Sequence, residues 1–336
     1  MSVIARFVGS VTIAASAVFM SQSAGAAEVW RLSSMMTPDS FEGQTYQKFA
    51  DLVDEYTDGE ITVRIYPNEQ IGSMDSVVEQ LSQGIVQLAP SGLSFLSRWE
   101  DGIRYAAAPF LFDDYQHWSN FVNGDLFQSW LASVEEEADI TVLGNIPDTP
   151  RGSFRTLLSK TPVETADDIE GLKLRQYQDQ LVIDAWTHLG AEVRVLPWGE
   201  VYDGINRGIV DAVTSPAELI ESMRFYEVAP YIIRTNEYPQ AVAWMMNADA
   251  WNALTPDQQD AMLRAHSEAA AYGRQLLDDA SATLEQDLKS KEGVTVNFDF
   301  DTAPLVEKMA TFYQQRADAG ELPEGLMQAV QAARQE

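Results

Sequence analysis

The sequence predicts an α/β protein made of two similar lobes that face each other across a cleft. Three observations predict this fold. Strand-like and helix-like segments alternate from residue 28 onward, one alternating unit occurs twice, and a helical stretch near the carboxyl terminus is long enough to lie across both copies. About 300 residues remain after a predicted leader, which is enough for two ordinary domains.

The first 27 residues are predicted to be a signal peptide. Arg6 supplies a positive charge, residues 7–20 are apolar or small, and Ala24-Gly25-Ala26 fits a cleavage site, so the mature chain is expected to begin near Ala27 or Glu28. A membrane anchor is the alternative, but the apolar run falls short of the ~20 residues that span a bilayer. We therefore expect an exported, soluble protein. Because the chain has no cysteine, burial of a core must hold it together.

The charge balance excludes some classes of partner. Lys and Arg number 22 against 51 Asp and Glu, a net charge of −29, whereas nucleic acid and anionic lipid both need a basic surface. An acidic chain with few lysines fits a saline habitat, and a simple compositional bias fits equally well. If the ligand is an anion, its binding must depend on a few arginines held in a cleft.

The first unit reads as β-α-β-α-β. Thr37 and Pro38 are expected to cap and begin the first helix. The expected elements are a strand at 28–33, a helix whose buried stripe runs from Phe41 to Tyr56 and ends at Gly59, a strand at 61–65 closed by Tyr66-Pro67, a helix around 77–81, and a strand at 85–89.

Part of this β-α-β-α-β unit recurs later in the sequence. Residues 77–91 align with residues 201–215 without a gap, and residues 63–67 match 193–197. Two matches in the same order favour a duplicated lobe. Two such lobes form a cleft lined by strand ends, and that shape suits hinge closure on a small ligand.

The segment between the copies is rich in aromatic residues. Residues 104–144 are expected to supply core aromatics and a strand at 140–143. Residues 148–152 are expected to cross between the lobes, and Arg155 lies in a strand, 153–158, just after that crossing.

The second copy places an arginine at a strand end. A short acidic turn at 167–169 leads through Gly171 into a strand that ends at Arg175, and a helix follows within 176–190. In open α/β sheets, ligands bind at the carboxyl ends of strands. Arg175 is therefore predicted to bind a carboxylate.

The remaining elements follow the second copy. Thr255 and Pro256 are expected to begin a helix of about 50 Å that ends at Gly293. The other expected elements are a helix at 216–224, a segment from 226 to 233 leading into a strand at 241–246, a strand at 294–298, and a helix from 304 to the end.

Several segments together resemble a known family. The chain resembles the solute-binding proteins of tripartite ATP-independent periplasmic (TRAP) transporters, of the dicarboxylate-receptor type, over essentially the whole mature length. The segments that carry the resemblance are Trp30-Arg31-Leu32, Tyr66-Pro67 with Gln70-Ile71-Gly72, residues 168–175, Glu200-Val201-Tyr202 with Gly208-Ile209-Val210-Asp211, residues 225–228, and Thr235-Asn236.

The resemblance implies a type II-like, two-lobed periplasmic binding protein with a hinge and a long helix that spans both lobes. Lobe I would comprise residues 28–152 plus 241–280, and lobe II residues 153–240 plus 281–336. Such a protein is a periplasmic receptor, not an enzyme. It captures a small organic acid and delivers it to the small and large membrane subunits of a permease. We expect a monomer that needs no cofactor and no metal.

The resemblance also assigns roles to individual residues. In the family, the arginine that ends the Gly-Leu-Lys-Leu-Arg segment, here Arg175, pairs with the ligand carboxylate, because a planar guanidinium matches a carboxylate. Arg155 occupies the place of a second arginine, with Arg151 as a competitor. Trp198 occupies the place of an aromatic residue that packs on the ligand. The alternatives are structural ion pairs for the arginines and a role in the core for Trp198.

One segment departs from the family pattern. Many members have Gln-Glu-Asn-Pro where this chain has Val213-Thr214-Ser215-Pro216, so Ser215, with one hydroxyl donor, replaces an asparagine. This departure puts in doubt any transfer of sialic acid or C4-dicarboxylate specificity. Ser91 is the duplicated counterpart of Ser215, and both serines could instead be turn formers. Ser34 and Met35 complete the predicted site in the first lobe.

Two other functions stay open at this point. An enzyme is one, although His117, His188 and His266 lie in helical stretches without a nucleophile motif or metal-ligand spacing. A site built only of carboxylates would still allow catalysis. The other is a sensor subunit that presents its ligand to a membrane kinase.

Overall fold

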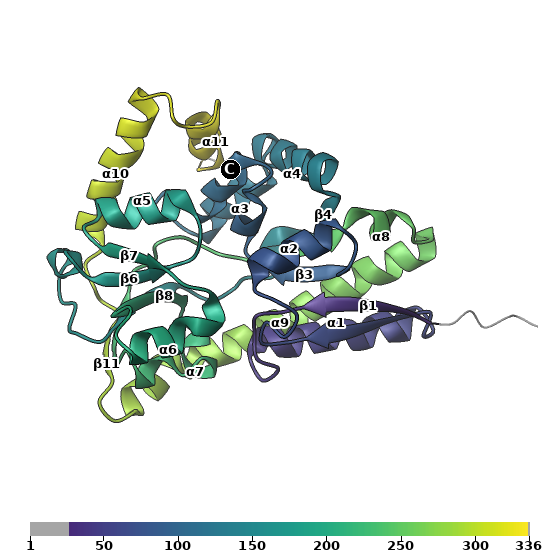
Figure 1. Cartoon of the computed structure of the whole chain (residues 1–336), viewed down its shortest axis with the longest axis horizontal. Helices are drawn as coiled ribbons and strands as arrows, with labels where there is room; N and C mark the ends of the chain where they lie inside the picture. The colour runs from purple at the N-terminus through teal and green to yellow at the C-terminus, as the bar shows by residue number, and fades with distance from the viewer. Residues whose placement is uncertain (1–26, 335–336) are drawn as a thin grey trace, which may run out of the picture.

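The computed structural model describes residues 27–334 and shows two mixed β-sheets, each flanked by helices (Figure 1). The predicted signal peptide therefore lies outside the described residues, apart from Ala27. The predicted two-lobed α/β fold is confirmed, with one sheet in each lobe.

The first sheet is built mainly from the amino-terminal part of the chain. Its first three strands are parallel to one another, and the fourth runs antiparallel to both of its neighbours. In spatial order the strands are β2 (Ile61–Tyr66), β1 (Glu28–Ser33), β3 (Leu88–Ser91), β10 (Ala243–Asn247) and β4 (Ile140–Leu143).

The second sheet repeats this plan with six strands. Strands β6, β7 and β8 are parallel, and β5 runs antiparallel to β8 and β9. In spatial order the strands are β11 (Thr295–Asn297), β9 (Tyr231–Arg234), β5 (Arg155–Ser159), β8 (Ala212–Pro216), β6 (Lys173–Gln176) and β7 (Glu192–Val195).

Eleven α-helices are present among residues 27–334. They are α1 (Phe41–Tyr56), α2 (Met74–Ser82), α3 (Tyr115–Asn123), α4 (Asp125–Ala138), α5 (Gln180–His188), α6 (Val201–Asn206), α7 (Leu219–Ser222), α8 (Ala248–Asn252), α9 (Pro256–Ser290), α10 (Ala303–Asp318) and α11 (Leu326–Ala333). The expected aromatic core is confirmed around α3 and α4, where Trp118, Phe121 and Phe127 are buried. Within the described part of the chain, no helix is long and apolar enough to cross a bilayer.

The predicted start of the first helix was wrong. Ser40 caps α1, because its Oγ accepts a hydrogen bond from the Gly43 backbone N–H at 3.0 Å. Thr37 and Pro38 instead belong to a turn, closed by the Ser40 hydroxyl, which donates to the Thr37 carbonyl. At the other end α1 stops at Tyr56, and Gly59 adopts a positive φ of 76° just beyond it.

Helix α9 spans both lobes, as expected (Figure 1). Thr255 caps it through the expected capping box with Gln258. Met262 and its neighbours are buried in the core beside the first sheet, whereas Leu284 and Leu288 are buried beside the second sheet.

Two stretches of chain cross between the sheets side by side. Pro150 and Ala241 form an antiparallel bridge, and the Val242 N–H donates to the Thr149 carbonyl at 2.8 Å.

The carboxyl-terminal segment, expected to be a single helix, forms two helices, because Gly320, Pro323 and Gly325 interrupt it. Helix α10 packs on α5 in the second lobe, and α11 crosses back to pack on α3.

Candidate ligand-binding site

A cavity of about 420 Å³ lies between the two lobes, and both lobes line it. From the second lobe, β6 contributes Arg175 and Gln176 at its carboxyl end, and β8 contributes Thr214 and Pro216. From the first lobe, Met35 follows the end of β1. The cavity therefore lies where strand ends converge, which is the expected location in an open α/β sheet.

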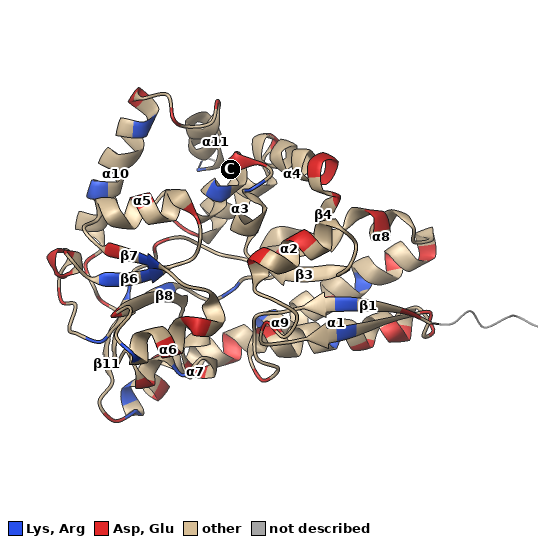
Figure 2. Cartoon of the chain, viewed as in Figure 1, with Lys and Arg blue, Asp and Glu red and all other residues tan. Residues whose placement is uncertain are grey.

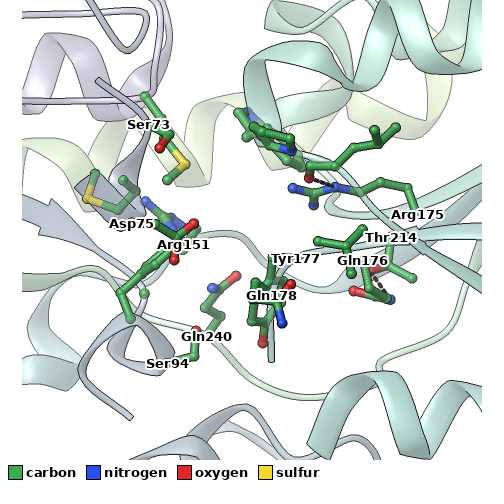
Figure 3. A pocket seen from close by; sticks show the side chains of 18 of the residues that line it. Ser73, Asp75, Ser94, Arg151, Arg175, Gln176, Tyr177, Gln178, Thr214 and Gln240 are labelled. Atoms are coloured by element: carbon green, nitrogen blue, oxygen red, sulfur yellow. Dashed lines mark hydrogen bonds between the residues drawn. The ribbon is translucent and has the colours of Figure 1, made fainter. Parts of the chain in front are cut away.

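Arg175 is buried in the cavity wall without a carboxylate partner. Its side chain is 5% exposed, and its Nε donates to the Leu196 carbonyl at 2.9 Å. Among residues 27–334, no Asp or Glu oxygen lies within 4.0 Å of its guanidinium. Burial, together with the charge of Arg155, lowers the pKa of Arg175 to about 10. The guanidinium thus stays protonated at neutral pH and forms no ion pair with the residues that the structure describes. Figure 3 shows Arg175 among the residues that line the cavity.

Arg155 also lines the cavity, but its charge is already paired. It lies 2.7 Å from the Glu237 carboxylate, donates to Gln240 Oε1 at 2.9 Å and to Thr214 Oγ1 at 3.0 Å, and packs over the Tyr238 ring at 4.5 Å. Arg155 therefore joins β5, β8 and the segment between β9 and β10 in one network.

Arg151 is paired even more completely. Its Nε and Nη2 donate to the two oxygens of Glu42 at 2.8 Å each, and the Tyr46 hydroxyl donates to the same carboxylate at 2.6 Å. A bidentate pair of this kind fixes the first crossing to α1. Arg151 is thus a structural residue at the edge of the cavity.

Trp198 lies between the cavity and the core of the second lobe. Its ring lines the cavity and lies 5.3 Å from the Arg175 guanidinium carbon, and its centroid lies 5.1 Å from that of the Phe225 ring in the second-lobe core, edge to face. The ring therefore packs Arg175 against the core and presents an aromatic surface to the cavity.

Comparison with known proteins identifies the family. Residues 32–319 match the family model DctP, described as bacterial extracellular solute-binding protein, family 7. The chain belongs to this family. A solute-binding protein of Sulfitobacter sp. (strain NAS-14.1) is 31% identical over 288 residues, which cover 84% of this chain and 85% of the relative.

Similar proteins carry names and ligands that show what this fold can bind. The 2,3-diketo-L-gulonate-binding periplasmic protein of Escherichia coli (strain K12) is 26% identical over 76% of each chain. The C4-dicarboxylate-binding periplasmic protein of Rhodobacter capsulatus is 26% identical over 78% of this chain and 77% of its own. A TRAP periplasmic solute-binding protein from Roseobacter denitrificans, solved with bound L-galactonate, superimposes with a TM-score of 0.80 at 24% identity, covering 92% of this chain and 99% of that one.

The three predicted serines do not line the cavity of this family 7 protein. Ser215 lies on β8 between Thr214 and Pro216, so its side chain points to the opposite face of the strand, and its hydroxyl donates to the Pro216 carbonyl at 2.9 Å. The Ser34 hydroxyl accepts from the Met36 N–H at 2.9 Å. Ser91 is fully buried at the end of β3. Thr214, one residue before the position expected from the resemblance, lines the cavity instead.

Sequence reasoning missed several other residues of the cavity wall. Gln176 and Tyr177 directly follow Arg175 and also line the cavity. The predicted strand end at Arg175 could therefore have indicated these two residues as well. Tyr238 and Gln240 lie between β9 and β10, in a segment to which the sequence assigned no crossing and no part of the site. Burial raises the pKa of both tyrosines, so their hydroxyl groups are protonated donors at neutral pH.

Glu69 was also missed, and no sequence signal pointed to it. It lies between β2 and α2 of the first lobe and lines the cavity, and its carboxylate accepts a hydrogen bond from the Gly199 N–H of the second lobe at 3.1 Å. Glu69 therefore links the two lobes directly across the cavity.

Proposed function

We propose that this family 7 protein captures a small organic acid by its carboxylate, which pairs with Arg175 in the cavity between the lobes. The receptor then delivers the acid to a TRAP-type membrane permease. The observation that carries the proposal is a buried, protonated arginine without a carboxylate partner in the described chain.

The physical argument rests on the cost of burying a charge. An ion removed from water costs several kcal/mol unless a counter-charge repays that cost. Arg155 and Arg151 have such partners in Glu237 and Glu42, whereas Arg175 has none among residues 27–334. A ligand carboxylate would supply the missing charge, and the guanidinium fork suits two parallel hydrogen bonds to it.

The other predicted residues take supporting roles in this proposal. Trp198 covers Arg175 and offers a ring face to the carbon skeleton of the ligand, and Met35 offers apolar contact from the first lobe. Arg155 contributes positive potential and fixes Thr214 and Gln240, while its own hydrogen bonds are occupied by protein groups. Ser34, Ser91 and Ser215 are left out of direct ligand contact.

Receptor function is favoured over catalysis by the positions of the histidines. His117 Nε2 lies 2.8 Å from the Val330 carbonyl, His188 Nε2 lies 3.1 Å from the Lys308 carbonyl, and His266 is buried against Trp244. None of the three is among the residues that line the cavity. We therefore propose a receptor that releases its ligand unchanged.

The membership of family 7 and the predicted signal peptide support further parts of the proposal. The receptor works as a periplasmic monomer with small and large permease subunits as partners. We assign residues 28–152 and 241–280 to lobe I and residues 153–240 and 281–336 to lobe II, with α11 as a return crossing onto lobe I. Closure requires the ligand to contact both lobes, since only differential affinity shifts an open–closed equilibrium.

Removal of the Arg175 side chain tests the proposal. In a thermal-shift screen of mono- and dicarboxylates, sugar acids and zwitterionic osmolytes, the wild-type protein should be stabilised by at least one carboxylate. Arg175→Ala should lose roughly 2–5 kcal/mol of binding free energy for that ligand, because the ligand carboxylate would be buried unpaired.

Arg194→Ala is the matched control for this experiment. Arg194 pairs with Arg175 in register on the neighbouring strand, is exposed, and does not line the cavity. This variant should bind as the wild type does. Equal loss of affinity in both variants, or full binding by Arg175→Ala, would refute the assignment, and chemical alteration of the recovered ligand would refute the receptor.

A further inference from the structure

The charged groups around the cavity leave one cation and one carboxylate unpaired. Four arginines line it, and three of them pair with carboxylates: Arg98 with Glu79 and Asp75, Arg151 with Glu42, and Arg155 with Glu237. Arg175 is the fourth, and it has no such pair in the described chain. Of the two carboxylates that line the cavity, Asp75 lies 3.6 Å from Arg98, whereas Glu69 has no ion pair among residues 27–334.

Glu69 lies close to the predicted carboxylate site. The Glu69 carboxylate accepts a hydrogen bond from the backbone N–H of Gly199. Gly199 directly follows Trp198, and the ring of Trp198 lies against the Arg175 guanidinium. The charge of Glu69 acts on Arg175, and the charge of Arg175 acts on Glu69. Because Glu69 comes from the first lobe and Gly199 from the second, this hydrogen bond forms only when the two lobes are together.

We propose that Glu69 restricts the ligand to singly charged carboxylates whose remaining polar groups donate hydrogen bonds. The inference rests on the function proposed above and concerns the same cavity. The single unpaired cation, Arg175, accounts for one ligand carboxylate. A second carboxylate would find each remaining arginine of the cavity wall already paired and would meet the negative charge of Glu69.

The rest of the cavity wall fits a ligand with neutral or cationic donors. Glu69 and Asp75 are acceptors in this wall, and the side chains of Gln178 and Ser94 can accept as well as donate. Figure 3 labels Asp75, Ser94 and Gln178 around the cavity. Hydroxyl groups of a sugar acid and the ammonium of a zwitterion both supply such donors. The shared chemistry is one carboxylate plus donors, which separates this site from that of a dicarboxylate receptor.

Matched ligand pairs provide the test. Galactonate and galactarate have the same six carbons and the same four inner hydroxyl groups, and differ in one terminal carboxylate. Lactate with malate and alanine with aspartate extend the comparison to small hydroxy acids and zwitterions, and so distinguish hydroxyl donors from ammonium donors. Affinities would be measured by calorimetry at neutral pH, where all the carboxylates are ionised.

The wild-type protein should bind the singly charged member of a pair at least about tenfold more tightly than its doubly charged partner. Glu69→Gln keeps the side-chain volume and can still accept from the Gly199 N–H. It should reduce this ratio severalfold, chiefly by improving the affinity for the dicarboxylate. Glu200→Gln is the matched control, because Glu200 is exposed next to Gly199 and does not line the cavity, and it should leave the ratio unchanged.

The outcomes separate this inference from the proposed function. The role of Glu69 would be overturned if the wild type bound a dicarboxylate as tightly as the matched monocarboxylate. It would also be overturned if the ratio of these two affinities were the same in Glu69→Gln as in the wild type. In either case Arg175 could still hold a carboxylate. A chain that binds no carboxylate in the panel or in the thermal-shift screen would instead overturn the proposed function and the inference that rests on it.

Discussion

At the scale of single residues, Arg155 and Arg175 show how similar side chains differ in role. Both are buried arginines at strand ends, and both line the same cavity. Arg155 is neutralised inside the protein by Glu237, whereas Arg175 is not. The first arginine should therefore matter to the unliganded fold, and the second to ligand binding.

This difference predicts opposite effects of truncation on stability. Arg155→Ala should lower the free energy of unfolding of the unliganded protein by roughly 3–5 kcal/mol, because it leaves Glu237 as a buried charge without its partner. Arg175→Ala should leave that free energy nearly unchanged or slightly higher, since it removes an unpaired buried charge. Denaturant unfolding without ligand measures both values.

A second substitution checks the cause of the loss. Glu237→Gln in the Arg155→Ala background should recover a large part of the lost stability, because the amide is neutral. If the double variant is no more stable than Arg155→Ala, the unpaired charge of Glu237 is not the reason.

The sequence could predict Arg175 but could not distinguish it from Arg155. Local alternation and a strand end placed Arg175 near a cleft, and the family resemblance placed Arg155 there. Their partners decide their roles, and Glu237 and Glu42 lie 82 and 109 residues away in the chain. In a chain with 51 acidic residues, spacing alone cannot select the carboxylate that pairs with a given arginine.

At the scale of elements, the packing of α9 on α1 depends on a glycine. Gly273 lies inside α9, where alanine would favour the helix by about 1 kcal/mol. A Cβ there would lie 2.4 Å from Thr45 Oγ1 and 3.0 Å from Thr45 Cγ2 on α1. The Thr45 side chain is buried and its hydroxyl donates to the Phe41 carbonyl, so it cannot turn away freely.

Gly273→Ala should therefore destabilise the protein by roughly 1–3 kcal/mol, the usual cost of overpacking, in spite of the better helix propensity. Thr45→Ala in the same chain removes the clashing atoms, so the double variant should be more stable than Gly273→Ala alone. Thermal unfolding of the three variants measures both effects. A stabilised Gly273→Ala protein would show that the helices can move apart at little cost.

The elements also show what sequence patterns resolve and what they miss. The repeat predicted equivalent strands in both lobes, and both exist, but each begins three residues later than the apolar pattern indicated, at Leu88 and at Ala212. Ile85 and Ile209, read as strand residues, are 45% and 49% exposed. They follow Gly84 and Gly208, whose positive φ values continue the turn. The predicted strand start was therefore three residues too early in both copies, because the same turn precedes the strand in each.

At the scale of the whole molecule, acidic residues are spread over the helices and loops of both lobes (Figure 2). The structure thus combines a strongly negative exterior with a cavity that has one unpaired cation. Long-range repulsion from the exterior grows with the charge of an anion, so selection among anions of equal charge must come from short-range contacts in the cavity.

The same charge should make the stability of the fold depend on salt. A net charge of −29 destabilises the compact state through self-repulsion, and salt reduces the screening length from about 10 Å at 0.1 M to about 3 Å at 1 M. The melting temperature at pH 7.5 should therefore rise between these concentrations of NaCl. A gain of 1 kcal/mol would appear as an increase of roughly 2 °C for a chain of this size.

Acidification supplies the contrast that identifies the cause. Near pH 4.3, the isoelectric point, the net charge is close to zero, so the increase caused by NaCl should largely vanish. Sucrose at equal osmolality strengthens burial through exclusion from the surface, and this effect should be similar at both pH values. An equal NaCl effect at pH 7.5 and near pH 4.3 would mean that salt acts through the solvent. A fall in melting temperature at pH 7.5 would mean that the attractive ion pairs, and not the repulsion among the acidic residues, dominate the electrostatic free energy of this fold.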